Sequence, residues 1–101
     1  MIQYEIKITG RVQGVGFRYF VAHKAKEFGI SGWVKNTVDG SVLVMAQGEE
    51  SELNTFIDYL FIGPTLSRVD RISKYKMNSL SEFLAAPSAI LEGTETALLL
   101  I

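Results

Sequence analysis

Hydrophobic and polar residues alternate strictly near the start of the chain. The apolar positions are Ile2, Tyr4, Ile6 and Ile8, and a polar or charged residue follows each of them. A period of two is typical of a strand that buries one face and exposes the other, because successive side chains point to opposite sides. The pattern therefore predicts a half-buried β-strand from Ile2 to Thr9.

Two later segments have the period of an amphipathic helix. In the first, apolar residues recur at helical spacing from Phe17 to Phe28, and Gly29 follows as a stop signal. Gly63-Pro64 would end the second helix, since proline cannot continue it, and Ser51 is a candidate N-cap. The apolar positions of this second helix, spaced i, i+3, i+4, i+7 and i+8, are Leu53, Phe56, Ile57, Leu60 and Phe61.

Three further segments are expected to be strands. Ile30 to Lys35 and Ser41 to Gln47 flank Asp39-Gly40, a pair that favours a hairpin turn. Arg68 to Met77 would be the fourth strand, although its apolar residues break the period of two, as a β-bulge or a loose edge would cause. The order of elements predicts an α+β fold, a ferredoxin-like split βαβ (βαββαβ) sandwich with an antiparallel sheet and two helices on one face.

The end of the chain does not continue this plan. We expect one domain over residues 1–83 and a C-terminal tail over residues 84–101. Either Glu82 to Ala86 or Thr96 to Ile101 could add a fifth strand at the edge of the sheet, while Pro87 cannot lie inside a central strand. The sequence leaves both positions open.

The composition excludes several classes of protein. The chain has 101 residues, enough for one domain, and a net charge of -1, which argues against a dedicated nucleic-acid binder. It has no cysteine, which excludes disulfides, thiolate nucleophiles and cysteine-ligated metals, and its one histidine argues against a histidine-rich metal centre. We find no secretory signal and no apolar run of about 20 residues. We therefore expect a cytoplasmic protein.

The candidate chemistry lies between the first strand and the first helix. Gly14 and Gly16 place a loop at the helix start, where backbone N–H groups lack partners within the helix and the dipole is positive. Arg18 adds a planar cation suited to phosphate or carboxylate. The loop matches neither the dinucleotide fingerprint nor the P-loop. The residues indicate an anion site, with a simple tight turn as the alternative.

Asn36 is the second candidate. It ends the second expected strand just before the hairpin, where asparagine is also a common turn former. In a split βαβ sheet that strand end could lie near the loop after the first strand. A neutral amide there can orient a water molecule without repelling an anionic substrate. His23 is expected at the surface, and packing and solvation would account for Trp33 and Lys35.

Five short segments of the chain form a recognisable set: GRVQGVGFRYF at 10–20, GWVKN at 32–36, DGSV at 39–42, Gly63-Pro64 and Arg68-Val69-Asp70. Together they resemble the acylphosphatase family, and the resemblance covers about Tyr4 to Tyr75. The combination of GRVQGVGFR with GWVKN at this spacing is highly specific.

The resemblance implies an enzyme that hydrolyses acyl phosphates to a carboxylate and inorganic phosphate, without a metal or another cofactor. It implies that Arg18 and Asn36 are the catalytic residues, Arg18 binding the phosphoryl group through its guanidinium and Asn36 orienting the attacking water. It also implies a phosphate-binding loop whose backbone N–H groups belong to Gln13, Gly14, Val15, Gly16, Phe17 and Arg18. We expect a monomer with a small acyl phosphate as its substrate, and no nucleic-acid or membrane partner.

Three other functions share parts of this pattern. Similar domains begin hydrogenase-maturation carbamoyltransferases, but those proteins continue into cysteine-rich zinc modules, and this chain has no cysteine. RNA-recognition domains share the order of elements, yet Ile6 to Gly10 and Ser41 to Gln47 lack their interleaved aromatic and basic residues. A catalytically silent interaction module is the last alternative, against which Arg18 and Asn36 argue.

Overall fold

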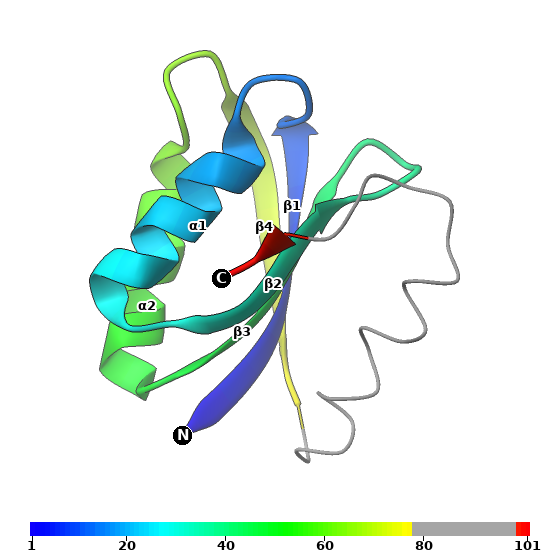
Figure 1. The fold of residues 1–101 in the computed structure, drawn as a ribbon. Helices are drawn as coiled ribbons and strands as arrows, with labels where there is room; N and C mark the ends of the chain where they lie inside the picture. Colours follow the sequence, from blue (N-terminus) through cyan, green and yellow to red (C-terminus); the bar gives the residue numbers. More distant parts are fainter. Residues whose placement is uncertain (78–98) are drawn as a thin grey trace.

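The computed structural model describes residues 1–77 and 99–101, in which five strands form one antiparallel sheet with two helices on one face (Figure 1). The strand order is β4-β1-β3-β2-β5. The predicted ferredoxin-like arrangement is confirmed. In chain order the elements are β1 (Ile2–Arg11), α1 (Phe17–Phe28), β2 (Ser31–Asn36), β3 (Val42–Gly48), α2 (Glu50–Ile62), β4 (Arg68–Lys76) and β5 (Leu99–Leu100).

The position of β3 organises the sheet. β3 lies between β1 and β2 and is antiparallel to both, so β1 and β2 run parallel and α1 connects them. Val42, the first residue of β3, pairs with Ile8 of β1 on one side and with Asn36 of β2 on the other. Neighbouring strands are about 4.8 Å apart. This register therefore brings the end of β2 close to the end of β1, from which the loop to α1 departs.

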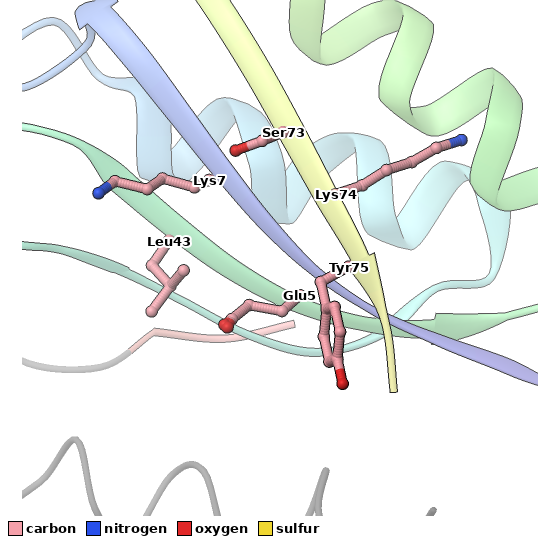
Figure 2. A pocket seen from close by; sticks show the side chains of 6 residues that line it. All are labelled: Glu5, Lys7, Leu43, Ser73, Lys74 and Tyr75. Carbon is pink, nitrogen blue, oxygen red and sulfur yellow. The ribbon is translucent and has the colours of Figure 1, made fainter. Parts of the chain in front are cut away.

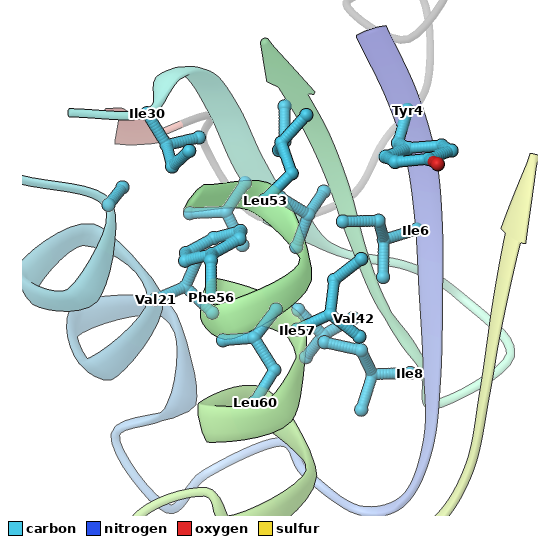
Figure 3. Packing of buried hydrophobic residues seen from close by; sticks show 14 of the residues in the cluster. Tyr4, Ile6, Ile8, Val21, Ile30, Val42, Leu53, Phe56, Ile57 and Leu60 are labelled. Carbon is cyan, nitrogen blue, oxygen red and sulfur yellow. The ribbon is translucent and has the colours of Figure 1, made fainter. Parts of the chain in front are cut away.

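The apolar face of β1 packs against the helices. Figure 3 shows Tyr4, Ile6 and Ile8 directed towards α2, as the alternation along the first strand predicts. Phe61, the last residue of the predicted apolar stripe, is instead 51% exposed, because it lies near the end of α2 beyond the sheet-facing residues. The α2 residues that are buried are Leu53, Phe56, Ile57 and Leu60.

The fourth strand contains the β-bulge that its irregular pattern suggested. Thr9 of β1 pairs with Arg71, whereas the next residue, Gly10, pairs with Val69. Asp70 is thus the extra residue on β4. The bulge moves the apolar positions of β4 out of the period of two, while Val69 and Ile72 both still pack against the main core.

Two local predictions were wrong. Ser51 lies inside α2, because the chain is extended at Glu49, which is the N-cap residue, and Glu50 and Glu52 place negative charge at the positive end of the helix. Lys35 is buried rather than solvated, at 5% exposure. Lys35 alternates with the core residue Val34, so it lies on the same face of the sheet as Trp33, which is also buried.

A smaller cluster lies on the face of the sheet opposite to the main core, since Trp33 alternates with the core residue Val34. Trp33 packs there with Met45 and Met77. On the outer side of β2, Leu99 and Leu100 pair with Val34 and Trp33 and form β5. This strand occupies one of the two positions expected for a fifth strand; the other, Glu82 to Ala86, and the domain boundary at residue 83 lie outside the described residues.

Gly32 allows β2 and β3 to approach closely. Its φ is +143°, and a Cβ atom there would lie 1.8 Å from the carbonyl oxygen of Met45. We expect Gly32→Ala to lower the free energy of unfolding by at least about 3 kcal/mol. The control is Gly29→Ala, where φ is +68° but no described atom lies within 4 Å, and where we expect a loss of about 1–2 kcal/mol. Equal losses in urea unfolding would contradict this explanation.

Candidate active site

The loop between β1 and α1 has a backbone conformation that requires glycine. Gly14 and Gly16 have φ of +73° and +80°, while Val15 between them has a negative φ. A Cβ atom at either glycine would meet no described atom within 4 Å, so conformation rather than space demands glycine here. Alternation of left- and right-handed residues turns successive N–H groups towards one concavity, which is how backbone nests bind anions.

The start of α1 adds to the positive character of this concavity. Gly16 is the N-cap residue, no described side chain caps the helix, and the first turn contains no acidic residue. The N–H group of Phe20 donates to the carbonyl oxygen of Gly16 at 3.1 Å. The N–H groups before Phe20 precede the first intrahelical bond. Both the dipole and these donors favour an anion at this end of the helix.

A cavity of about 120 Å³ brings the two sequence-predicted catalytic residues together. Arg18 enters it from the first turn of α1 and Asn36 from the end of β2, and both are half-buried. Among the described residues that line the cavity, Arg18 is the only charged one. The lining residues are Val12, Gly14, Gly16, Phe17, Arg18, Tyr19 and Asn36.

The lining differs in detail from the predicted loop. Gln13 and Val15, which belong to the predicted phosphate-binding loop, do not appear among the lining residues, whereas Tyr19 does. The Tyr19 side chain is 72% exposed beside the cavity. Sequence reasoning missed it, although its position directly after Arg18 in the first helical turn was a usable signal. His23 is exposed, as expected.

Phe17 fixes the start of α1 against the rest of the molecule. Its ring is 2% exposed, and a Cβ atom added to Gly63 would lie 2.9 Å from the Phe17 ring. The loop after α2 therefore packs beside the loop before α1, and both lie at the same end of the molecule (Figure 1). Burial of Phe17 orients the neighbouring Arg18 towards the cavity edge rather than the core.

The hairpin turn after Asn36 is held by a cluster of hydrogen bonds around Asp39. Its carboxylate accepts from Thr37 Oγ1, from Ser41 Oγ at 2.6 Å and from the Ser41 N–H at 3.0 Å. Its other oxygen lies 2.8 Å from Nζ of Lys7 on β1. The hydrogen bond from Lys7, followed by those from Ser41 and Thr37, lowers the pKa of Asp39 well below its usual range.

Gln13 connects the β1–α1 loop to this turn. Its side-chain Nε2 donates to the carbonyl oxygen of Thr37 at 2.7 Å and to that of Ser41 at 2.9 Å. The sequence indicated only a backbone role for Gln13, because no local pattern reveals a contact between residues 24 and 28 positions apart.

A second cavity, of about 220 Å³, lies on the face of the sheet that carries no helix (Figure 2). None of its described lining residues comes from the β1–α1 loop or from the hairpin, so it is separate from the cavity at Arg18 and Asn36. Its lining residues are Glu5, Lys7, Leu43, Ser73, Lys74 and Tyr75.

The described residues contain neither a candidate metal-binding cluster nor a helix that could cross a membrane. Within residues 1–77 and 99–101, no group of three His, Cys, Asp or Glu side chains is arranged to hold a metal ion. Over the same ranges, every helix is too short or too polar to cross a membrane.

Comparison with known proteins places the chain in one family. The family model described as Acylphosphatase matches residues 4–85, which include the glycine loop, Arg18 and Asn36. The chain belongs to the acylphosphatase family, and the expectation of a hydrolase of this type is confirmed.

Curated relatives and solved structures agree with this assignment. The acylphosphatase of Mannheimia succiniciproducens is 43% identical over 83 residues, which cover 82% of this chain and 92% of the relative. The acylphosphatase of Bacillus subtilis is 46% identical over 80 residues, covering 79% of this chain and 88% of the relative. A crystal structure of acylphosphatase from Bacillus subtilis superposes with a TM-score of 0.78 at 44% identity, covering 82% of this chain and 92% of that one.

The same fold also occurs within a much longer protein. The structure of full-length HypF in the phosphate- and nucleotide-bound form matches 78% of this chain with a TM-score of 0.70 and 31% identity, but only 10% of that chain is covered. The likeness therefore concerns one part of HypF.

We expect Asp39→Asn to make stability less dependent on acid pH. The folded protein holds the pKa of Asp39 below its unfolded value of about 3.9. Its stabilising contribution is therefore complete above that value and is lost as pH falls towards the folded pKa. The urea midpoint of Asp39→Asn should lie below that of the wild type at pH 7, and the gap should narrow from pH 4 downwards. The control is Asp58→Asn, an exposed carboxylate of α2. If the difference in urea midpoint between the wild type and Asp39→Asn stays constant with pH, the charge of Asp39 does not have the stabilising role given to it here.

Proposed function

We propose that this chain hydrolyses the carboxyl–phosphate bond of small acyl phosphates in the cavity between the glycine loop and Asn36. The observation that carries the proposal is the joint lining of one 120 Å³ cavity by Gly14, Gly16, Arg18 and Asn36. A cavity of this size suits a phosphoryl group, and the acyl group would extend past Tyr19 into solvent. The products are a carboxylate and inorganic phosphate.

The loop and Arg18 hold the phosphoryl group in this mechanism. Backbone N–H groups from Gln13 to Arg18 donate to its oxygens, and the Arg18 guanidinium adds a two-pronged, permanently charged contact. Two observations support this role. The first turn of α1 contains no acidic residue that would offset the positive end of the helix dipole, and both loop glycines have the left-handed conformation. Phosphoryl transfer mainly requires such positioning and charge stabilisation, so fixed donors supply most of what the reaction needs.

Asn36 orients the attacking water. Its side-chain oxygen accepts one hydrogen of the water, which leaves a lone pair of the water oxygen directed at phosphorus. As the new P–O bond forms, the bond between phosphorus and the carboxyl oxygen breaks, and the carboxylate leaves with the electron pair. The protons of the water remain with the phosphate product and solvent. A carboxylate is a good leaving group, so the mechanism uses no general acid, metal or cofactor.

The remaining sequence-based expectations extend this proposal. The substrate is a small acyl phosphate, such as an acetyl, carbamoyl or aromatic one, and the enzyme works as a cytoplasmic monomer without nucleic-acid or membrane partners. The net charge of -1 supports the absence of nucleic acid.

The likeness to one part of HypF favours one second candidate, a domain within a longer protein. Among proteins of that kind, the chain resembles the first domain of the hydrogenase-maturation carbamoyltransferases. Carbamoyl phosphate would then be hydrolysed far better than benzoyl phosphate, which a direct comparison of the two substrates measures.

We expect Asn36→Ala to fold normally and to lower kcat for benzoyl phosphate by about 10² to 10³ or more, because the water is no longer positioned. The assay contains EDTA, and Asn54→Ala, at an exposed position of α2, serves as the matched control. Near-normal turnover of a folded Asn36→Ala variant would remove Asn36 from the mechanism. Loss of wild-type activity in EDTA would overturn metal independence.

Arg18→Lys should also be severely impaired, since a point charge cannot replace a two-pronged contact. We expect the inhibition constant of inorganic phosphate to rise by about tenfold or more, because the variant loses one or more charge-assisted hydrogen bonds to phosphate. The matched control is Arg71→Lys at an exposed position of β4. Unchanged inhibition by phosphate in Arg18→Lys would show that the guanidinium does not bind the phosphoryl group.

A further inference from the structure

The side-chain amide of Gln13 joins two parts of the site that come from distant positions in the chain. Nε2 donates to the carbonyl oxygens of Thr37 and Ser41 at 2.7 Å and 2.9 Å, and the Gln13 residue is half-buried. A primary amide carries two N–H donors, and both are used here. No other natural side chain offers two donors on one uncharged nitrogen, apart from the shorter asparagine.

The two carbonyl groups that Gln13 contacts close the base of the hairpin turn. The Thr37 N–H donates to the carbonyl oxygen of Ser41 at 3.0 Å, and the Gly40 N–H donates to that of Thr37 at 3.1 Å. Thr37 directly follows Asn36. The amide of Gln13 therefore binds the turn one residue away from the side chain that is proposed to orient the water.

The turn is braced by contacts among its own residues. Asp39 binds Thr37 and Ser41, and its second oxygen contacts Lys7 on β1. The hydroxyl groups of Thr37 and Ser41 also lie 2.6 Å apart. Internal bonds of this kind fix the shape of the turn, but of these contacts only Gln13 links it to the loop that would hold the phosphoryl group.

We propose that Gln13 is a positioning residue whose side-chain amide sets the separation between the phosphate-binding loop and Asn36. This inference rests on the proposed function. It adds that the attacking water and the phosphorus atom are aligned by a side chain that lines no part of the cavity. A displacement of about 1 Å at a reacting centre can cost about 10² in rate.

The test replaces Gln13 with methionine, which keeps the length of the side chain and removes both donors. We expect kcat for benzoyl phosphate to fall by about tenfold to a hundredfold, while the inhibition constant of phosphate changes by less than about threefold. The phosphate contacts all lie on the loop side of the link, so binding should survive its loss. The matched control is Gln47→Met, whose side-chain amide contacts Met1 Sδ far along the sheet from the turn. A wild-type kcat in Gln13→Met, or an equal loss of phosphate binding, would overturn the positioning role.

A double-mutant cycle separates positioning from general loss of structure. In the Asn36→Ala background the water is already unpositioned, so adding Gln13→Met should change kcat by less than about twofold. Full additivity of the two losses would contradict the inference. Inactivity of Asn36→Ala combined with wild-type kcat in Gln13→Met would reject only the role of Gln13. High activity in Asn36→Ala would instead reject the proposed function.

A second variant keeps the inference testable if Gln13→Met folds poorly. Gln13→Asn retains both donors on a stem that is one methylene shorter, so it can reach at most one of the two carbonyl oxygens. We expect its kcat to lie between those of the wild type and Gln13→Met, with unchanged inhibition by phosphate. A kcat equal to that of the wild type would show that the span of the link does not matter.

Discussion

The pairing of Val42 with both Ile8 and Asn36 is the constraint on which the rest of the site depends. It places β3 between two parallel strands and so brings the ends of β1 and β2 to the same end of the sheet. The strand ends are distant along the chain, but their shared register partner on β3 fixes them two strand spacings apart. A shift of this register by one residue would turn Asn36 to the opposite face, away from α1 and Arg18.

Around this frame the described lining of the cavity combines neutral groups with one cation, the character that the proposed negatively charged substrate requires. The cavity has Arg18 as its charged lining residue, backbone amides on one side and an uncharged amide on the other. The acidic side chain of the hairpin turn, Asp39, forms an ion pair with Lys7 and accepts hydrogen bonds from Thr37 and Ser41. Asp39 is not among the described lining residues of the cavity.

Much of the fold was predictable because it follows from short-range patterns. The alternation in β1, the helical periods of α1 and α2, and the irregular spacing that marked the bulge in β4 all lie within one element. The juxtaposition of Arg18 with Asn36 followed from topology, once the order of elements was known. The site residues beyond these depended on family resemblance, since glycines in a loop are equally compatible with a plain turn.

What the sequence did not reveal depends on contacts between distant segments. The side chain of Gln13 reaches the turn at Thr37 and Ser41, a contact with no local signature. Lys35 alternates like a solvated residue yet is only 5% exposed, on the same face of the sheet as the buried Trp33. Ser51 has the chemistry of a cap, but the N-cap residue is Glu49, two residues earlier, where the chain is extended.

The bulge at Asp70 also affects how this sheet meets other chains. Among the described strands, β4 is an outer strand of nine residues, long enough to offer a row of backbone groups to a strand from another molecule. The extra residue interrupts the regular spacing of those groups, and exposed charges at Arg68, Asp70, Arg71, Lys74 and Lys76 flank them. Adding a strand there would require burying several charges against an irregular ladder. The irregularity in β4 is thus a barrier to edge-to-edge aggregation through this outer strand.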